Sequence, residues 1–153
     1  MNPSGRSAKA RVSLRPLSEE DATMSAGRRS SLDWGRAGAL PYEIVRRADG
    51  AAIGEVKCRA DEPAAGWLTV GCIALAEGER GWGYGSEAVR LLEAKAKAKA
   101  VRFRADVDAG NGLALYFWLR LGYRPARAGE VPGRPPRGMI AMVREAQNLE
   151  PRT

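Results

Sequence analysis

The chain has 153 residues, of which 44% are hydrophobic and 28% are charged, and these proportions exclude a disordered, fibrous or membrane-spanning protein. Histidine is absent and the two cysteines stand apart, so a transition-metal site or a histidine-based triad would lack its usual ligands or base, and we expect no metal. The net charge of +7 suits an anionic ligand, either nucleic acid or a phosphate-bearing small molecule, or simply a solvated basic surface.

Length and hydropathy predict one cytoplasmic domain. No run approaches 18 apolar residues, and Met1–Arg15 has no apolar stretch of the signal-peptide type. We place the domain at residues 11–146, between flexible tails at residues 1–10 and 147–153. Cys58 and Cys72 lie in apolar runs without C-x-x-C spacing, which predicts reduced, buried thiols.

Strands dominate the first half of the chain. Val12–Leu17 alternates apolar and polar residues as a strand does, and Pro16 indicates a sheet edge or a strand end. Ser18-Glu19-Glu20-Asp21 predicts a helix start, whereas the poor periodicity of Gly27–Leu40 indicates a short helix and a loop. Three further strands are expected, namely a hairpin of Tyr42–Arg47 and Ile53–Arg59, then the apolar run Trp67–Leu75.

Helices and strands alternate in the second half. Ser86–Lys99 is rich in helix-forming residues, and the strand after it, Val101–Val107, is expected to run parallel to Trp67–Leu75. A second helix is predicted at Gly112–Leu121, because Asn111 is a suitable N-cap and Gly122 a suitable C-terminal stop. The predicted last pair of strands is Tyr123–Ala128 and Met139–Arg144.

The sharpest signal is a glycine-rich segment before the first of these helices, Arg80-Gly81-Trp82-Gly83-Tyr84-Gly85-Ser86. Glycines let the backbone approach a ligand closely and a helix N-terminus adds partial positive charge, so the segment favours a phosphate or pyrophosphate. A Walker A loop is excluded, because Gly83 is followed by Tyr84 instead of lysine. Two alternatives stay open, a tight turn without a ligand and a dinucleotide fingerprint, Gly83-x-Gly85-x-x-Ala88 with Asp106 as its ribose-binding acid.

Two motifs resemble those of the GCN5-related N-acetyltransferase (GNAT) family. Arg80-Gly81-Trp82-Gly83-Tyr84-Gly85 is similar to its [Q/R]-x-x-G-x-[G/A] loop, which holds the pyrophosphate of acetyl-CoA. Asn111-x-x-Ala114-x-x-Phe117-Trp118-x-x-Leu121-Gly122-Tyr123 is similar to its N-x-x-A-x-x-[LF]-Y-x-x-x-G-[FY] segment. The resemblance spans roughly Val12–Arg144, and it implies a single α/β domain with a mixed, mostly antiparallel sheet of six or seven strands and helices on both faces.

Carried over residue by residue, the resemblance implies a site for acetyl-CoA as cosubstrate. The amides of Gly81 to Ser86 would hold the pyrophosphate, and a side chain on Gly83 or Gly85 would collide with it. The pantetheine arm would enter a gap where Trp67–Leu75 splays from Val101–Val107. The implied cofactor-binding residues are Ile73, Ala74, Leu75, Arg80, Gly81, Trp82, Gly83, Tyr84, Gly85, Ser86, Asn111 and Trp118.

The sequence departs from the family where the general acid is expected. Trp118 occupies the position of the usual tyrosine, and Tyr116 lies about 200° around the helix, so it should point away from the thiolate. Trp118 is expected to wall the thiol site, while water, Tyr84 or Tyr123 could supply the proton. For the general base, Glu55 is the first candidate, followed by Asp106 and Asp108.

These features predict an acetyl-CoA-dependent N-acetyltransferase that acts by direct attack of a primary amine. The amine could belong to a small molecule or to a protein N-terminus, since Gly83–Ala88 is similar to the branch that acetylates N-termini. A homodimer is possible. The main alternative is a non-catalytic acyl-CoA-binding module, and less favoured ones are a dinucleotide-binding or nucleic-acid-binding protein, because the basic residues are scattered.

Overall fold

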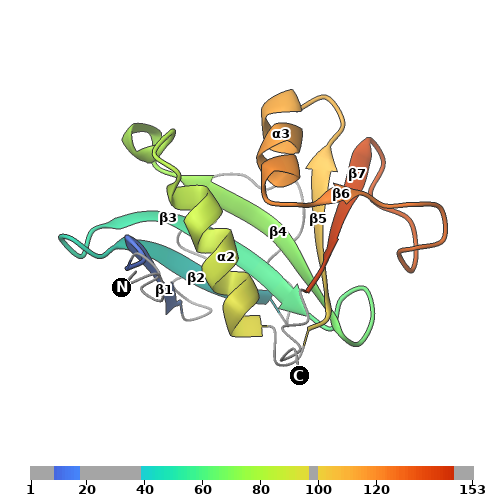
Figure 1. Cartoon of the computed structure of the whole chain (residues 1–153), viewed down its shortest axis with the longest axis horizontal. Coiled ribbons are helices and arrows are strands. Elements are labelled where there is room, and N and C mark those ends of the chain that lie inside the picture. Colours follow the sequence, from blue (N-terminus) through green and yellow to red (C-terminus); the bar gives the residue numbers. More distant parts are fainter. Residues whose placement is uncertain (1–8, 18–38, 97–99, 147–153) are drawn as a thin grey trace, which may run out of the picture.

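The computed structural model describes residues 9–17, 39–96 and 100–146 of the chain. Within these residues, seven strands form one sheet with the order β1-β2-β3-β4-β5-β7-β6 (Figure 1). In this described part β4 and β5 run parallel, and every other neighbouring pair is antiparallel. The strands are β1 (Val12–Pro16), β2 (Ala39–Arg46), β3 (Ala52–Ala60), β4 (Trp67–Leu75), β5 (Arg102–Asp108), β6 (Arg124–Pro125) and β7 (Met139–Glu145).

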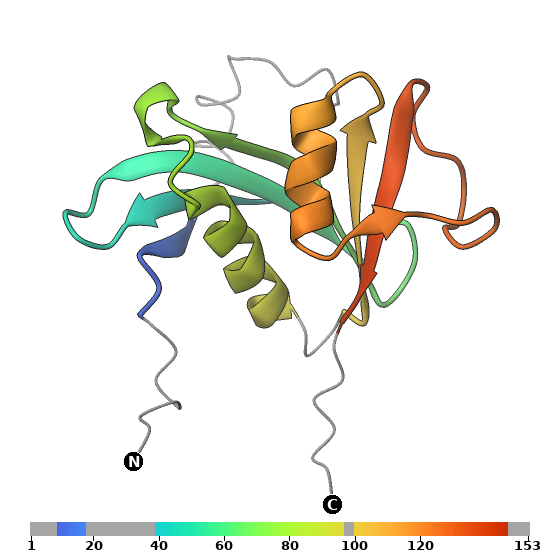
Figure 2. The same cartoon turned by 45° about the horizontal axis from the view of Figure 1, so that its top comes forward.

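Both helices of the described residues, α2 (Tyr84–Ala96) and α3 (Gly112–Arg120), lie on one face of the sheet (Figure 2). Val89 and Leu92 of α2 join Trp118 of α3 in a hydrophobic cluster with inward-facing side chains of the strands. The sequence predicts helices on both faces, but its other helical segments fall largely within residues 18–38, outside the described residues. The predicted α/β domain with a mixed, mostly antiparallel sheet is confirmed.

Most predicted elements are confirmed with small shifts at their ends. β4 has the predicted bounds, whereas α2 begins at Tyr84 instead of Ser86, and residues 97–99 of the predicted helix lie outside the described residues. The prediction of a loop up to Leu40 is wrong at its end, because β2 already begins at Ala39. Leu40 pairs with Cys58 of β3, which gives the segment a strand partner that periodicity alone does not reveal.

The strand predicted at Tyr123–Ala128 is much shorter, because the chain there caps a helix. Gly122 has a φ of +90°, and the Tyr123 N–H donates to the Trp118 carbonyl oxygen at 3.0 Å, which closes the end of α3. This bond uses the backbone donor of Tyr123, and Pro125 has none to offer. β6 is therefore reduced to Arg124–Pro125.

A buried polar network connects α2 to β7 and to the chain after α3. The carboxylate of Glu93 accepts hydrogen bonds from Tyr123 Oη at 2.8 Å and from Arg144 Nη1 at 2.5 Å. Burial and the neighbouring Glu93 raise the pKa of Tyr123, so its hydroxyl stays protonated and serves as a donor. Because a buried charge without its partner is costly, this network makes the arrangement of α2 over the sheet specific.

Candidate active site

The sheet opens between β4 and β5. The two strands pair from Trp67 opposite Arg102 as far as Val70 opposite Ala105. At that point β4 carries a bulge at Gly71, as the register shows: Cys58 of β3 lies opposite Val70, and the preceding Lys57 lies opposite Cys72. Beyond the bulge, the described residues of β4 pair with β3 and those of β5 pair with β7. The carboxyl halves of the parallel strands therefore leave backbone groups free to face a ligand between them.

The glycine-rich segment lies at the end of this opening. A 3-10 turn, η1 (Glu77–Glu79), follows β4 and leads into the loop before α2. Gly81 and Gly83 have φ values of +84° and +86°, a conformation that side chains disfavour. Among the described residues, no atom lies within 4 Å of a Cβ built on Gly81, and at Gly83 the neighbour found is Arg11 Nη2 at 3.2 Å. The outer side of the loop is therefore open to a ligand.

Two ion pairs fix the entry to this loop. The Arg46 guanidinium donates to both oxygens of Glu79 at 2.7 Å and to Asp49 at 2.8 Å and 3.0 Å. The hydrogen bonds from Arg46 and, to a lesser extent, from the Ala51 N–H lower the pKa of Asp49 to about 2. The pairs tie the turn between β2 and β3 to η1. At the end of β4, Arg80 Nε donates to the Leu75 carbonyl oxygen at 3.2 Å, so one donor of this predicted cofactor-binding residue is turned back to the strand.

Gly85 serves a different purpose from Gly81 and Gly83. It is buried, and a Cβ built on it would lie 3.3 Å from Phe117 Cε2 and 3.6 Å from Leu75 Cδ1. The sequence predicts that a side chain here collides with a bound pyrophosphate. In the structure the added atom points at α3 and β4 instead, so Gly85 is required for the close contact between the N-terminal turn of α2 and α3.

The residues predicted on α3 occupy three different environments. Asn111 caps the helix by accepting the Ala114 N–H on its side-chain oxygen at 3.0 Å. Trp118 is 6% exposed and makes edge contacts with the rings of Phe117 and Tyr123. Tyr116 is 61% exposed, and the Arg120 guanidinium lies over its ring. The opposite orientations of Trp118 and Tyr116 confirm the predicted helical geometry, while contacts of Asn111 and Trp118 with a cofactor stay predictions.

The carboxylate candidates lie on the face of the sheet away from α2 and α3. Glu55 of β3 is half-buried, opposite Glu43 of β2 on one side and Ala74 of β4 on the other. Burial, followed by the charge of Glu43, raises the pKa of Glu55, and the opposing effect of Lys57 does not cancel this shift. A carboxyl group with a raised pKa beside the open half of β4 is suited to accept a proton.

The two aspartates of β5 are already engaged. Asp106 forms an ion pair with Arg104 at 2.9 Å, and both side chains are largely buried. Asp108 is exposed and accepts the Gly110 N–H at 2.8 Å in the turn that leads to α3. Of the three carboxylates named from the sequence, Glu55 is the one that lies opposite the open half of β4 with a raised pKa, and these two features favour a role in proton transfer.

The alternative proton donors also differ in their surroundings. Tyr123 is 1% exposed and its hydroxyl is held by Glu93, so it is a core residue that a substrate cannot reach. Tyr84 is half-buried at the first turn of α2, and the Arg11 guanidinium lies 4.8 Å from its ring centroid. Sequence reasoning missed both Arg11 and Glu93. An arginine far from the motif and a glutamate on an amphipathic helix carry no local signal of these contacts.

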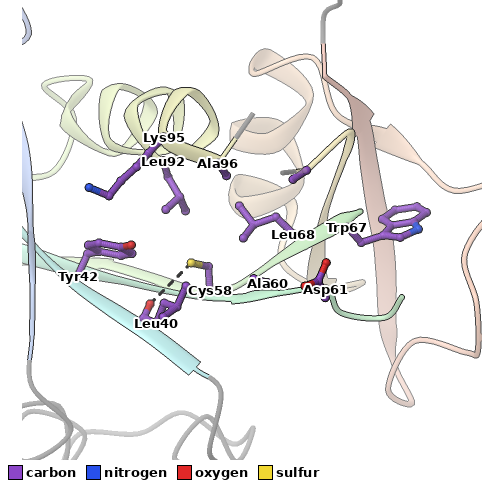
Figure 3. Close-up of a pocket in the computed structure, with 11 residues that line it drawn as sticks. Leu40, Tyr42, Cys58, Ala60, Asp61, Trp67, Leu68, Leu92, Lys95 and Ala96 are labelled. Atoms are coloured by element: carbon purple, nitrogen blue, oxygen red, sulfur yellow. Dashed lines mark hydrogen bonds between the residues drawn. The ribbon is translucent and has the colours of Figure 1, made fainter. Parts of the chain in front are cut away.

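An apolar cavity of about 310 Å³ lies between the C-terminal half of α2 and strands β2 to β4 (Figure 3). Leu40, Cys58, Leu68 and Leu92 contribute to its walls, and Lys95 lies over the ring of Tyr42 at its rim. Burial raises the pKa of the Cys58 thiol to about 12. None of the predicted site residues lines this cavity in the described part of the chain, so it is separate from the opening between β4 and β5.

Two further properties bear on the kind of site present. In residues 9–17, 39–96 and 100–146, no group of three or more cysteine and carboxylate side chains is arranged to hold a metal ion. The described helices are also too short or too polar to cross a membrane.

Comparisons with known proteins agree with this geometry. The family model described as "Acetyltransferase (GNAT) family" matches residues 12–123. No curated protein sequence matches the chain significantly. Among solved structures, a GNAT family acetyltransferase from Elizabethkingia anophelis with acetyl-CoA bound is 14% identical, with a TM-score of 0.64, and 90% of this chain and 100% of that chain are covered.

Two other structures with known ligands or activities have the same fold. Arabidopsis thaliana Naa50, in complex with the bisubstrate analogue CoA-Ac-MVNAL, is 15% identical, with a TM-score of 0.68 and coverage of 89% of this chain and 99% of that chain. Spermidine N-acetyltransferase from Vibrio cholerae, a dodecamer, is 14% identical, with a TM-score of 0.67 and coverage of 90% and 95%. The family model spans most of the chain, including both motifs, and the chain therefore belongs to the acetyltransferase (GNAT) family of enzymes.

Proposed function

We propose that this protein transfers the acetyl group of acetyl-CoA to a primary amine by direct attack. The observation that carries the proposal is the opening between β4 and β5, which ends at a loop whose Gly81 and Gly83 leave room for a phosphate. Membership of the acetyltransferase family supports it. The likeness in fold to a protein with acetyl-CoA bound supports the choice of cosubstrate.

The residues at the opening fit a nucleotide thioester. The amides of Gly81 to Ser86 at the N-terminus of α2 would hold the pyrophosphate, because that end of a helix carries partial positive charge. Backbone groups of Ile73, Ala74 and Leu75 would hydrogen bond the pantetheine arm along the unpaired edge of β4. Arg80, Trp82, Tyr84, Asn111 and Trp118 complete the proposed set.

Acetyl-CoA supplies an activated acyl group, and the residues of the chain manage the proton of the incoming amine. An ammonium group has no lone pair for attack, so a base must first take its proton. We assign this task to Glu55, directly or through one water, because its pKa is raised and it lies opposite Ala74 of β4. The amine nitrogen then bonds to the acyl carbon and the carbon–sulfur bond breaks. The second proton that the nitrogen loses passes through water to the CoA thiolate, which leaves as the thiol.

A covalent acetyl-enzyme is not part of the proposal. Cys72 is the cysteine on the open half of β4, and burial raises the pKa of its thiol despite the charge of nearby Lys57. A thiol with a raised pKa is a poor nucleophile, since the thiolate is the reactive form. The chemistry therefore favours direct transfer over a two-step route through cysteine.

The acceptor is proposed as a class and not as a compound. The named relatives in fold include an enzyme that acetylates spermidine and one solved with a peptide-based bisubstrate analogue. Both suggest a primary amine, on a small molecule or at a protein N-terminus. We also propose residues 11–146 as the functional domain and the cytoplasm as its location.

Two measurements test the proposal. Acetyl-CoA should raise the melting temperature, since a ligand that binds only the folded state stabilises it, and NAD should have much less effect. Turnover should then be sought with a panel of polyamines, amino sugars and N-terminal peptides, by assay of free CoA thiol. Stabilisation by NAD but not by acetyl-CoA would overturn the proposal. Tight binding of acetyl-CoA without turnover of any amine would favour the non-catalytic acyl-CoA-binding module.

A further inference from the structure

We infer that Arg11, which directly precedes β1, binds a phosphate group of acetyl-CoA from outside the glycine-rich loop. The inference rests on the proposed function and adds a residue that the two sequence motifs do not contain. Its basis is the position of the guanidinium, which lies against the loop, the first turn of α2 and solvent at the same time.

The contacts of Arg11 place it at the phosphate loop. Its Nη2 atom lies 3.2 Å from a Cβ built on Gly83, and its guanidinium carbon lies 4.8 Å from the centroid of the Tyr84 ring. A side chain on Gly83 would point to the outer side of the loop, toward Arg11. A group that approaches the loop from its outer side therefore meets the Nη end of Arg11.

Glu87 holds the Nε side of the same guanidinium group. Arg11 Nε donates to Glu87 Oε2 at 3.0 Å, and the backbone N–H groups of Arg11 and Val12 donate to Oε1. These bonds hold the guanidinium in place while 53% of the Arg11 side chain stays exposed. Within the described residues, no hydrogen bond is found from either Nη atom of Arg11, and the exposure of the side chain leaves these donors on the outer side of the loop.

The charges of Glu87 and Arg11 explain why an arginine is suited to this position. Glu87 lies in the first turn of α2, where its negative charge would oppose a phosphate bound at the helix N-terminus. Arg11 neutralises that carboxylate with Nε and turns its remaining donors outward. Guanidinium groups bind phosphate oxygens through two N–H donors, which this fixed geometry presents.

Neighbouring arginines place their donors differently. Arg46 uses Nε, Nη1 and Nη2 on Asp49 and Glu79, and Arg80 turns its Nε to the carbonyl oxygen of Leu75. Arg47 follows β2, and its backbone N–H donates to the Arg11 carbonyl oxygen, but its exposed side chain forms no hydrogen bond or ion pair with the described residues. Arg47 is therefore a matched control for loss of one positive charge near Arg11.

The test measures the affinity for acetyl-CoA by calorimetry with the full chain, at one fixed ionic strength. Arg11→Gln should weaken binding about tenfold or more relative to Arg47→Gln, because a hydrogen bond to a charged group is lost. Melting temperatures without ligand verify that both variants are folded. Acetyl-dephospho-CoA then distinguishes the source of the phosphate. An equal loss with this ligand assigns the pyrophosphate, and a loss confined to acetyl-CoA assigns the 3′-phosphate.

A second pair of variants separates direct binding from neutralisation of Glu87. In a Glu87→Gln background, Arg11→Gln should still weaken binding about tenfold if Arg11 touches the phosphate. If the effect of Arg11→Gln disappears in that background, or never exceeds that of Arg47→Gln, the inference is overturned while the proposed function stands. If the wild-type protein does not bind acetyl-CoA at all, both the inference and the proposed function fail.

Discussion

A Cβ built on Gly85 would lie 3.3 Å from Cε2 of Phe117, which makes this glycine the contact point between α2 and α3. The third glycine of the loop therefore acts on packing between helices, and the first two act on the backbone conformation of the loop. This distinction changes what a substitution at each position should do.

Gly85→Val should reduce the free energy of unfolding by more than it reduces the binding free energy for acetyl-CoA. Its branched side chain would overpack the space against Phe117 and Leu75, at a cost of about 1–3 kcal/mol in the free energy of unfolding. Urea denaturation measures this loss. Adding Phe117→Leu to the valine variant should restore part of it, because the substitution removes the ring that the new methyl groups meet. No recovery in the double variant would contradict the assigned contact.

Tyr123→Phe should destabilise the fold and leave turnover of the folded enzyme intact. The hydroxyl donates to the buried carboxylate of Glu93, and loss of a hydrogen bond to a charged group costs about 1.5–3 kcal/mol. Tyr116→Phe is the matched control, since Tyr116 is exposed and its hydroxyl has no partner among the described residues. A large loss of rate per folded molecule in Tyr123→Phe would restore this tyrosine as a general acid.

The sequence predicted the elements of the sheet well because local patterns determine them. The apolar run Trp67–Leu75 became β4 with the same bounds. Asn111 caps the start of α3 with its side chain, and Gly122 adopts the positive φ that ends the helix. The resemblance to the family also led to the opening between β4 and β5. The register of the two strands bears this out, since their pairing stops at Val70.

Contacts between distant residues could not be predicted from the sequence. Glu87 and Arg11 are 76 positions apart, and Glu93 and Arg144 are 51 apart. On its own, α2 presents Glu87 and Glu93 as ordinary polar residues of an amphipathic helix. The partner of Glu87 directly precedes β1 and that of Glu93 lies in β7, so the roles of both glutamates depend on the topology of the sheet and not on any local pattern.

The pH dependence of kcat/KM should identify Glu55. Its raised pKa means that, as pH falls, the carboxylate is protonated above the ordinary range for a glutamate, and protonation removes the base. The wild-type kcat/KM should therefore fall on the acidic side of its pH profile. Glu55→Gln should abolish this acidic limb and lower kcat/KM about a hundredfold near neutral pH. The rate is measured with one active amine at saturating acetyl-CoA.

Asp106→Asn is the comparison for this experiment. Asp106 is held by Arg104 on the same face of the sheet, so its substitution should affect stability and leave the acidic limb of the rate profile in place. If Asp106→Asn removes the limb and Glu55→Gln does not, the roles assigned to the two carboxylates are reversed.

Trp118→Phe should keep acetyl transfer within about tenfold of the wild type, which corresponds to about 1.4 kcal/mol in the barrier. Trp118 occupies the position of the family tyrosine but is buried against Phe117 and Tyr123, and an indole N–H cannot protonate a thiolate. Phenylalanine keeps an aromatic ring in the core, so the main effect should be a lower melting temperature from the unfilled volume. Stopped assays of free CoA thiol, corrected for the folded fraction, measure the rate.

Trp118→Tyr completes the test, because it installs the residue that the family motif carries. If the loss of an acid limits the enzyme, this variant should transfer acetyl groups faster than the wild type. If departure of the thiolate needs no acid here, Trp118→Tyr and Trp118→Phe should have similar rates, and we expect this second result because a CoA thiolate is a tolerable leaving group. A loss of a hundredfold or more in both variants would show that the indole itself is required, and would contradict its assignment to the core.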